Sequence, residues 1–115
     1  MRFIDMNVWH RGLDLVEEVY RLTKKFPKEE LYAMTSQLRR ASASIVANFA
    51  EGYSRSSSAD KCHKYAIARG ECSEVEALLL VSVRLKFPTE SEISQAARYV
   101  QEVGKMLTSL IHRYQ

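Results

Sequence analysis

Apolar residues recur at spacings of three and four in four stretches of the chain, and short polar segments separate these stretches. That spacing places the apolar side chains on one face of an α-helix. No segment shows the bounded alternation of apolar and polar residues that predicts a β-strand. The pattern therefore predicts four helices: one from about Asn7 to Lys25, a second carrying Leu31 to Phe49, a third from about Ala59 to Leu85, and a fourth carrying Ile93 to Tyr114.

Local signals predict where the first two helices begin and end. Asp5 or Asn7 can cap the first helix, because a short polar side chain accepts hydrogen bonds from the free amides of the first turn. Pro27 predicts its end, since the residue before a proline is pushed out of the α region. We expect the second helix to end at Gly52, ahead of a serine-rich loop over residues 54–58.

The other two helices carry start signals of their own. Ser57 or Ser58 can cap the third helix. Thr89 and Glu92 have the spacing of a capping box, in which each residue's side chain accepts from the backbone amide of the other. We expect this box to open the fourth helix.

Small and polar residues inside the helices predict particular contacts. Asn48 lies near the apolar face of the second helix, and we expect its amide to tie neighbouring helices together. Gly70 costs the third helix about 1 kcal/mol relative to alanine, which predicts a close helix crossing there. The core stripe of the third helix is expected to follow these residues: Cys62, Tyr65, Ala66, Arg69, Cys72, Val75, Glu76, Leu79 and Val83.

Four helices with short connections are typical of an all-α, antiparallel up-down-up-down bundle. A chain of 115 residues has the usual size of one domain, so we predict a single domain over residues 1–115. No apolar run approaches the ~20 residues that cross a bilayer, and the first residues lack the apolar core of a signal peptide. We therefore predict no membrane partner and a cytoplasmic location.

The positive charge of the chain is concentrated in its central third. The net charge is +3, but residues 1–38 are balanced and residues 71–115 are slightly acidic. Residues 39–70 contain only two acids, Glu51 and Asp60. The six basic residues of this segment are the predicted nucleic-acid contacts, because clustered cations favour phosphate binding: Arg39, Arg40, Arg55, Lys61, Lys64 and Arg69. Tyr53, beside Arg55, could stack on a base.

Residue patterns typical of catalysis or metal binding are missing from the sequence. The histidines, His10, His63 and His112, fall on three different predicted helices and outside any metal-binding motif. Cys62 and Cys72 share one helix about 15 Å apart, too far for a disulfide, and are expected to be buried thiols. We predict no catalytic residues, no metal, no cofactor and no enzymatic activity.

Several motifs resemble a known bacterial family. The sequence has Val-Trp at Val8–Trp9, Phe-Pro-Lys-Glu-Glu at Phe26–Glu30, Thr-Ser-Gln-Leu-Arg-Arg-Ala at Thr35–Ala41, and Ser-Ile-x-Ala-Asn-x-Ala-Glu-Gly at Ser44–Gly52. Together they resemble the four-helix-bundle family of 23S rRNA intervening-sequence proteins, over essentially the whole chain. The accessory variability protein of diversity-generating retroelements is similar to that family.

The resemblance implies a bundle that assembles into a ring-shaped homopentamer with a basic surface for RNA or DNA. Likeness to the retroelement protein implies a reverse transcriptase as a further partner.

Two hypotheses about function remain. In the first, the six basic residues contact nucleic-acid phosphates with little sequence specificity, because no base-reading motif is present. In the second, the protein is a structural or protein-interaction module. Arg39, Arg40 and Arg69 then pair between helices or subunits with these acids: Glu51, Glu74 or Glu76.

Overall fold

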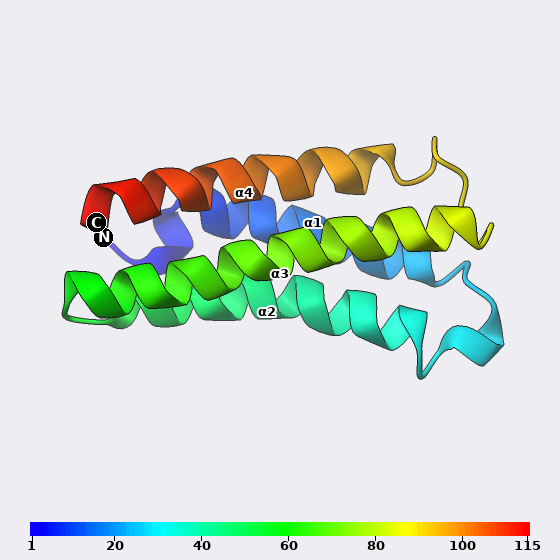
Figure 1. Ribbon diagram of the computed structural model, residues 1–115, viewed down its shortest axis with the longest axis horizontal. Helices are drawn as coiled ribbons and strands as arrows, with labels where there is room; N and C mark the ends of the chain where they lie inside the picture. The colour runs from blue at the N-terminus through cyan, green and yellow to red at the C-terminus, as the bar shows by residue number, and fades with distance from the viewer.

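Four α-helices make up almost the whole chain, which a computed structural model describes from residue 1 to 115. They are α1 (Asn7–Thr23), α2 (Met34–Ser54), α3 (Ser58–Arg84) and α4 (Ser94–Tyr114), with 3₁₀ turns at Phe3–Asp5 (η1) and Lys28–Glu30 (η2). The helices lie side by side in an elongated body of 43 × 24 × 21 Å (Figure 1). The predicted all-helical, four-helix fold without strands is confirmed.

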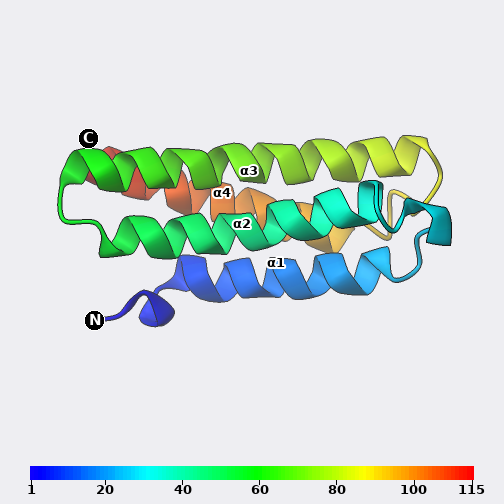
Figure 2. The same cartoon turned by 90° about the horizontal axis from the view of Figure 1, so that it is seen from below.

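The connections gather at the two ends of the bundle. The short α2–α3 loop lies at the same end as both chain termini, and the α1–α2 and α3–α4 connections lie at the opposite end (Figures 1 and 2). A hydrogen bond from Tyr53 Oη to the carbonyl oxygen of Met1, at 2.9 Å, ties the amino terminus to the end of α2. Residues from the start, middle and end of the sequence therefore meet at one end.

A continuous core of 21 buried apolar residues draws on all four helices. Leu15, Ile45, Leu79 and Leu107 lie at its centre with almost no exposed surface. Burying a leucine or isoleucine side chain contributes about 1.5–3 kcal/mol relative to leaving it in water, so this core is the main source of stability. The aromatic rings of Phe49 and Tyr65 stack within it at a centroid separation of 5.9 Å.

Two glycines allow helices to approach closely within this core. A Cβ atom on Gly12 would overlap Val46 Cγ1, and one on Gly52 would lie 2.8 Å from the ring of Tyr65. Gly52 was predicted to end the second helix, but α2 continues through it to Ser54. Its function is packing: the missing side chain makes room for the ring of Tyr65 on α3.

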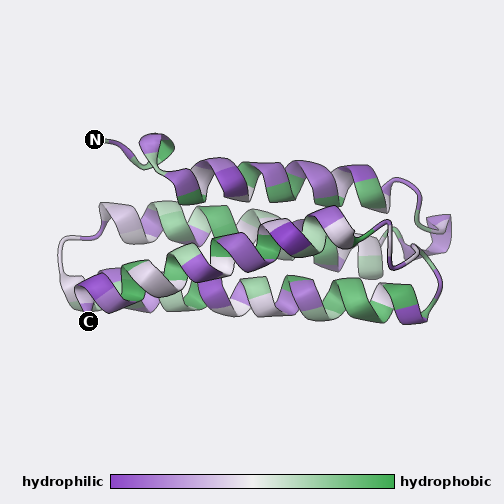
Figure 3. Ribbon diagram, turned by 90° about the horizontal axis from the view of Figure 1, so that it is seen from above, coloured by the Kyte–Doolittle hydropathy of each residue, from purple (hydrophilic) through white to green (hydrophobic).

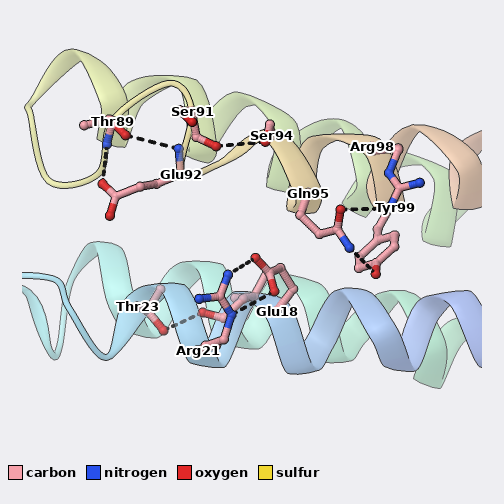
Figure 4. A network of polar contacts seen from close by, with 11 residues as sticks. Glu18, Arg21, Thr23, Thr89, Ser91, Glu92, Ser94, Gln95, Arg98 and Tyr99 are labelled. Carbon is pink, nitrogen blue, oxygen red and sulfur yellow. Dashed lines mark hydrogen bonds and ion pairs between the residues drawn. The ribbon is translucent and has the colours of Figure 1, made fainter.

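Two of the predicted capping interactions form. The Ser57 hydroxyl accepts a hydrogen bond from the backbone amide of Asp60 at the start of α3. Thr89 and Glu92 exchange the two hydrogen bonds of the capping box, at 2.8 and 3.1 Å (Figure 4). The box closes a turn, and regular α4 begins only at Ser94, after that turn.

The starts of the first two helices differ from the prediction. Neither Asp5 nor Asn7 caps α1, because its N-cap residue is Met6 and makes no side-chain capping bond. The second helix was predicted to carry Leu31, but α2 begins at Met34. Pro27 leads into the η2 turn, and Ala33 adopts a non-helical conformation, so the chain is redirected twice before α2 starts.

Three predictions about the helix interiors were also wrong. No atom lies within 4 Å of the position that a Cβ on Gly70 would occupy, so no helix of this chain crosses there. Asn48 donates to Ser44 on its own helix and ties no helices together. Ala66 is exposed, and the core face of α3 instead includes Ala68 and Ser82.

Candidate nucleic-acid interface

The six predicted contact residues fall into two groups and one separate position. Arg55, Lys61 and Lys64 lie in the α2–α3 loop and the first turns of α3, at the end that holds both termini. Arg39 and Arg40 lie in the second turn of α2, about 24 Å along that helix from Arg55. Arg69 projects from the middle of α3 towards α4, where its Nη1 lies 3.4 Å from Thr108 Oγ1. The segment thus forms no single patch on the protomer.

Lys64 forms the one ion pair among the six residues. Its Nζ lies 2.8 Å from Glu51 Oε2 on α2. The hydrogen bond from Lys64, followed by its charge, lowers the pKa of the Glu51 carboxyl below its ordinary value. The Glu51 side chain is about half exposed, so the pair contributes little stability, but it neutralises one of the predicted contacts.

Lys61 caps the end of α2. Its Nζ donates to the carbonyl oxygen of Tyr53 at 2.7 Å, one of those that the last turn of a helix leaves without a helical partner. It also lies 3.4 Å from the carbonyl oxygen of Gly52, which accepts from the backbone amide of Arg55 as well. The same ammonium group lies between the rings of Tyr53 and Tyr114, 5.5 and 5.6 Å from their centroids. One face of the Tyr53 ring, predicted to stack on a base, is therefore already used within the protein.

Arg39 is held between α1 and α2. Its Nε donates to Thr23 Oγ1 at 2.9 Å, and its guanidinium group lies 4.6 Å from the ring centroid of Tyr20. Thr23 in turn donates to the carbonyl oxygen of Val19. The geometry of Arg39 is fixed by neutral partners, and no carboxylate pairs with it.

Five of the six residues make no ion pair. The molecule has four ion pairs in all, and the three others involve Arg11, which pairs twice, and Arg21. The pairs of Arg39, Arg40 or Arg69 with Glu51, Glu74 or Glu76 that the interaction hypothesis requires do not form within the protomer. The positive charge of the central segment is therefore largely without neutralising carboxylates.

Arg113 adds a cation that the charge count by segment missed. It lines a groove of about 330 Å³ together with Met1 and Met6, at the end that carries Arg55. Cys62 at the start of α3 makes a sulfur contact of 3.5 Å with the carbonyl oxygen of Ile111, which confirms that the end of α4 lies beside the start of α3. Four helices with short connections imply this proximity, so the signal was in the sequence.

Glu71 and Glu74 form an acidic pair on α3 that has no cationic partner at ion-pair distance. Partial burial, followed by the charge of Glu74 and a hydrogen bond with it, raises the pKa of Glu71, while Arg40 acts in the opposite direction. The pair therefore carries unfavourable like-charge repulsion that Arg40 offsets only in part.

The remaining reactive side chains do not converge on a reaction centre. Burial raises the pKa of the Cys72 thiol to about 12, so it stays protonated, whereas Cys62 is only half-buried. No three histidine, cysteine or acidic side chains gather in a way that would hold a metal ion. None of the four helices combines the length and the apolar character needed to cross a membrane.

Comparisons with known proteins place these features in context. The family model described as 23S rRNA-intervening sequence protein matches residues 4–109. A crystal structure of a protein with unknown function from the S23 ribosomal protein family, from Bacteroides thetaiotaomicron VPI-5482, is 26% identical with a TM-score of 0.80. The match covers 90% of this chain and 97% of that one. A comparison with curated proteins finds no match.

Proposed function

The chain belongs to the 23S rRNA-intervening sequence protein family, and from this premise we propose that it is a non-enzymatic, self-associating bundle that binds RNA or DNA through phosphate groups. The observation that supports this proposal is the positive charge of residues 39–70, where five of six basic side chains lack a carboxylate partner. Unneutralised cations attract phosphates and release the counterions that surround a nucleic acid.

The contacts would be to the backbone of the nucleic acid and not to its bases. Arg55 is exposed in the α2–α3 loop, and Arg113 lies at the same end, where both can reach a phosphate. Arg55 lies in a loop and not on a helix that could enter a groove, and the sequence has no base-reading motif. Sequence specificity is therefore expected to be low.

Self-association would compensate for the modest charge of one chain. We infer an antiparallel up-down-up-down protomer in a ring-like homopentamer, located in the cytoplasm. A closed ring repeats each cationic group around its axis, so the summed field is several times that of one protomer.

A salt titration with matched variants tests the nucleic-acid proposal. Labelled single-stranded RNA and duplex DNA are titrated with the protein at about 50 and 200 mM salt, and the anisotropy of the label is measured. We expect affinity to fall steeply with salt, and the double variant Arg55→Gln, Arg69→Gln to bind more weakly and with a shallower salt dependence. The double variant Lys24→Gln, Lys28→Gln, which removes the same charge at the opposite end, serves as the control.

Two results would contradict the proposal: absence of binding by wild-type protein at low salt, and equal weakening in the control variant. The second result would show that total charge, and not the predicted residues, determines the affinity.

A structural or protein-interaction module is the second candidate, with a reverse transcriptase as one partner of the kind that the resemblance suggests. It is favoured by the internal use of Arg39, Lys61 and Lys64, whose polar groups are engaged by neighbouring helices. An assembled protein that binds neither RNA nor DNA at low salt would favour this candidate over the first.

A further inference from the structure

Helix α3 differs from the other helices because its outer face is small and apolar. The side of α3 that faces the core is apolar, as in any bundle helix. On the opposite, exposed side, about half of the residues are apolar as well. These exposed residues are Ala66, Ile67, Gly70, Ala77, Leu80, Val81 and Leu85. In Figure 3 the ribbon of α1 is largely hydrophilic, whereas the last turns of α3 are largely hydrophobic. A helix that is apolar on two sides is typical of one that is covered on both.

Gly70 lies at the middle of this outer face in open space, with no atom within 4 Å of an added Cβ. Glycine inside a helix costs about 1 kcal/mol relative to alanine, and no contact within the protomer offsets that cost. Gly104, on the neighbouring α4, is open in the same way. A close approach by another molecule would explain why glycine stands at both positions despite its cost to helix stability.

Glu74 is the acidic residue of the same face. It has no ion-pair partner, and it lies beside Glu71, a carboxylate of the same charge that it repels. A partner that covers the face must therefore bring a cation to this level, or the carboxylates would be buried without compensation.

The outer face of α2 has the complementary properties. Its exposed side is formed mainly by small residues such as Ala43 and Ala47, and Arg40 is its one exposed cation. Just before α2 begins, Tyr32 is 92% exposed at the edge of a hollow of about 370 Å³. The lining of the hollow is Tyr20, Leu31, Tyr32, Ser36, Arg39 and Arg40.

The groups on the outer faces of α2 and α3 lie at matching positions along the long axis of the bundle, which are called heights below. Lys64 lies level with Glu51, as their ion pair shows. Moving the same number of residues along both helices from this pair brings Arg40 about level with Glu74. It brings Ser36, which lines the hollow, about level with Leu79 near the end of α3. A ring whose axis runs parallel to the helices leaves heights unchanged from one copy to the next. The two faces would then meet in register across a subunit boundary.

We propose that the outer face of α3 in one copy docks on the outer face of α2 in the next copy, with Glu74 of the first paired with Arg40 of the second. This inference rests on the self-association included in the proposed function, and it names the surface. Ile67 packs on Ala47, and the apolar end of α3 enters the hollow beside Tyr32. Helix α2 approaches closely because Gly70 has no side chain. Arg40 is then a subunit contact, and phosphate binding falls to the remaining cations.

Charge reversal with mixing tests the pairing. Arg40→Glu and Glu74→Arg each place like charges opposite one another in every copy-to-copy junction. Sedimentation velocity should show each single variant dissociating at concentrations at least about tenfold above those at which wild type dissociates. An equimolar mixture of the two single variants should associate more strongly than either variant alone, because each junction between unlike chains again holds opposite charges. A ring of five keeps one junction between like chains, so the mixture should associate less strongly than wild type. The double variant Arg40→Glu, Glu74→Arg should assemble alone.

The mixture separates this proposal from a contact within one chain, because mixing cannot repair an intramolecular pair. Glu17→Arg reverses a charge on the outer face of α1 and should assemble like wild type. Circular dichroism of each variant confirms that it is folded. Three results would overturn the proposal: a monomeric wild type at about 100 μM, single variants that assemble normally, or a mixture that stays dissociated.

The outcome is distinct from failure of the nucleic-acid proposal. Assembly is measured without RNA or DNA, so the pairing can be confirmed for a protein that binds neither. Equally, RNA binding by a monomer would leave the nucleic-acid proposal intact and reject the docking surface.

Discussion

Two glycines lie in the contacts of α1, α2 and α3, and the two others lie away from such contacts, Gly70 on the outer side of α3 and Gly104 in the groove between α3 and α4. The two pairs have opposite surroundings. Gly12 and Gly52 are pressed against Val46 and the Tyr65 ring, so their missing side chains are explained within the protomer. Gly70 and Gly104 face open space. The comparison teaches that the interior of the bundle is complete, whereas the outer side of α3 has features that the protomer does not use.

Leu79 and Leu80 bring this contrast to neighbouring positions on one helix. Leu79 is 1% exposed in the core, and Leu80 is 60% exposed on the outer side. Leu79→Ala should lower the free energy of unfolding by about 2–5 kcal/mol, because it leaves a cavity among packed side chains. Leu80→Ala should change it by less than about 0.5 kcal/mol. Urea unfolding of both variants, at a concentration where the protein is dissociated, gives the comparison.

A large loss from Leu80→Ala under those conditions would show that its side is already packed within the protomer. The contrast between the two sides of α3 would then be wrong.

The glycines give a second and smaller test. Gly52→Ala should destabilise the protomer by about 1–3 kcal/mol, because the new methyl group would overlap the buried ring of Tyr65. Gly70→Ala should instead stabilise the dissociated protomer by about 1 kcal/mol, the difference in helix propensity. Thermal unfolding at low protein concentration measures both. Destabilisation by Gly70→Ala would indicate that its Cβ meets a neighbour even in the dissociated protomer.

The sequence predicted the number of helices and most of the core because the apolar spacing is set by the chain itself. The Thr89–Glu92 box and the Ser57 cap were predictable for the same reason, since each depends on residues three apart. The delayed start of α2 was not, because the redirection at Ala33 depends on where α1 and α2 must lie. Local preference alone predicts a helix end at Gly52, although Tyr65 on another helix explains the glycine.

The candidate site was predictable in its charges and not in its geometry. Which residues are basic follows from the sequence, and five of the six indeed lack a carboxylate partner. That Lys61 would cap α2, and that Arg39 would be fixed by Thr23, depends on contacts between helices. The position of Arg113 at the same end as Arg55 could have been predicted from the order of the helices alone. The charge count by segment did not show it, because Arg113 lies in a different segment.

The smallest expected effect concerns the acidic pair on α3. The pKa of Glu71 is raised in the folded protein, so folding favours its protonated form. Its charged form therefore costs stability at neutral pH, and this cost disappears as the pH falls below the ordinary carboxyl range, about pH 4. Glu74→Gln removes the repulsion and should stabilise the dissociated protomer at pH 7 by no more than about 0.5 kcal/mol, since the pair is mostly exposed. The gain should vanish towards pH 4, where the hydrogen-bonded carboxylates Glu51 and Glu92, whose pKa values are lowered, begin to lose their own contribution in both proteins. Thermal unfolding of the variant and of wild type across this pH range measures the difference.

A gain that persists at pH 4 would mean that Glu74 is unfavourable for a reason other than its charge. The requirement for a cation from a second copy would then lose its basis.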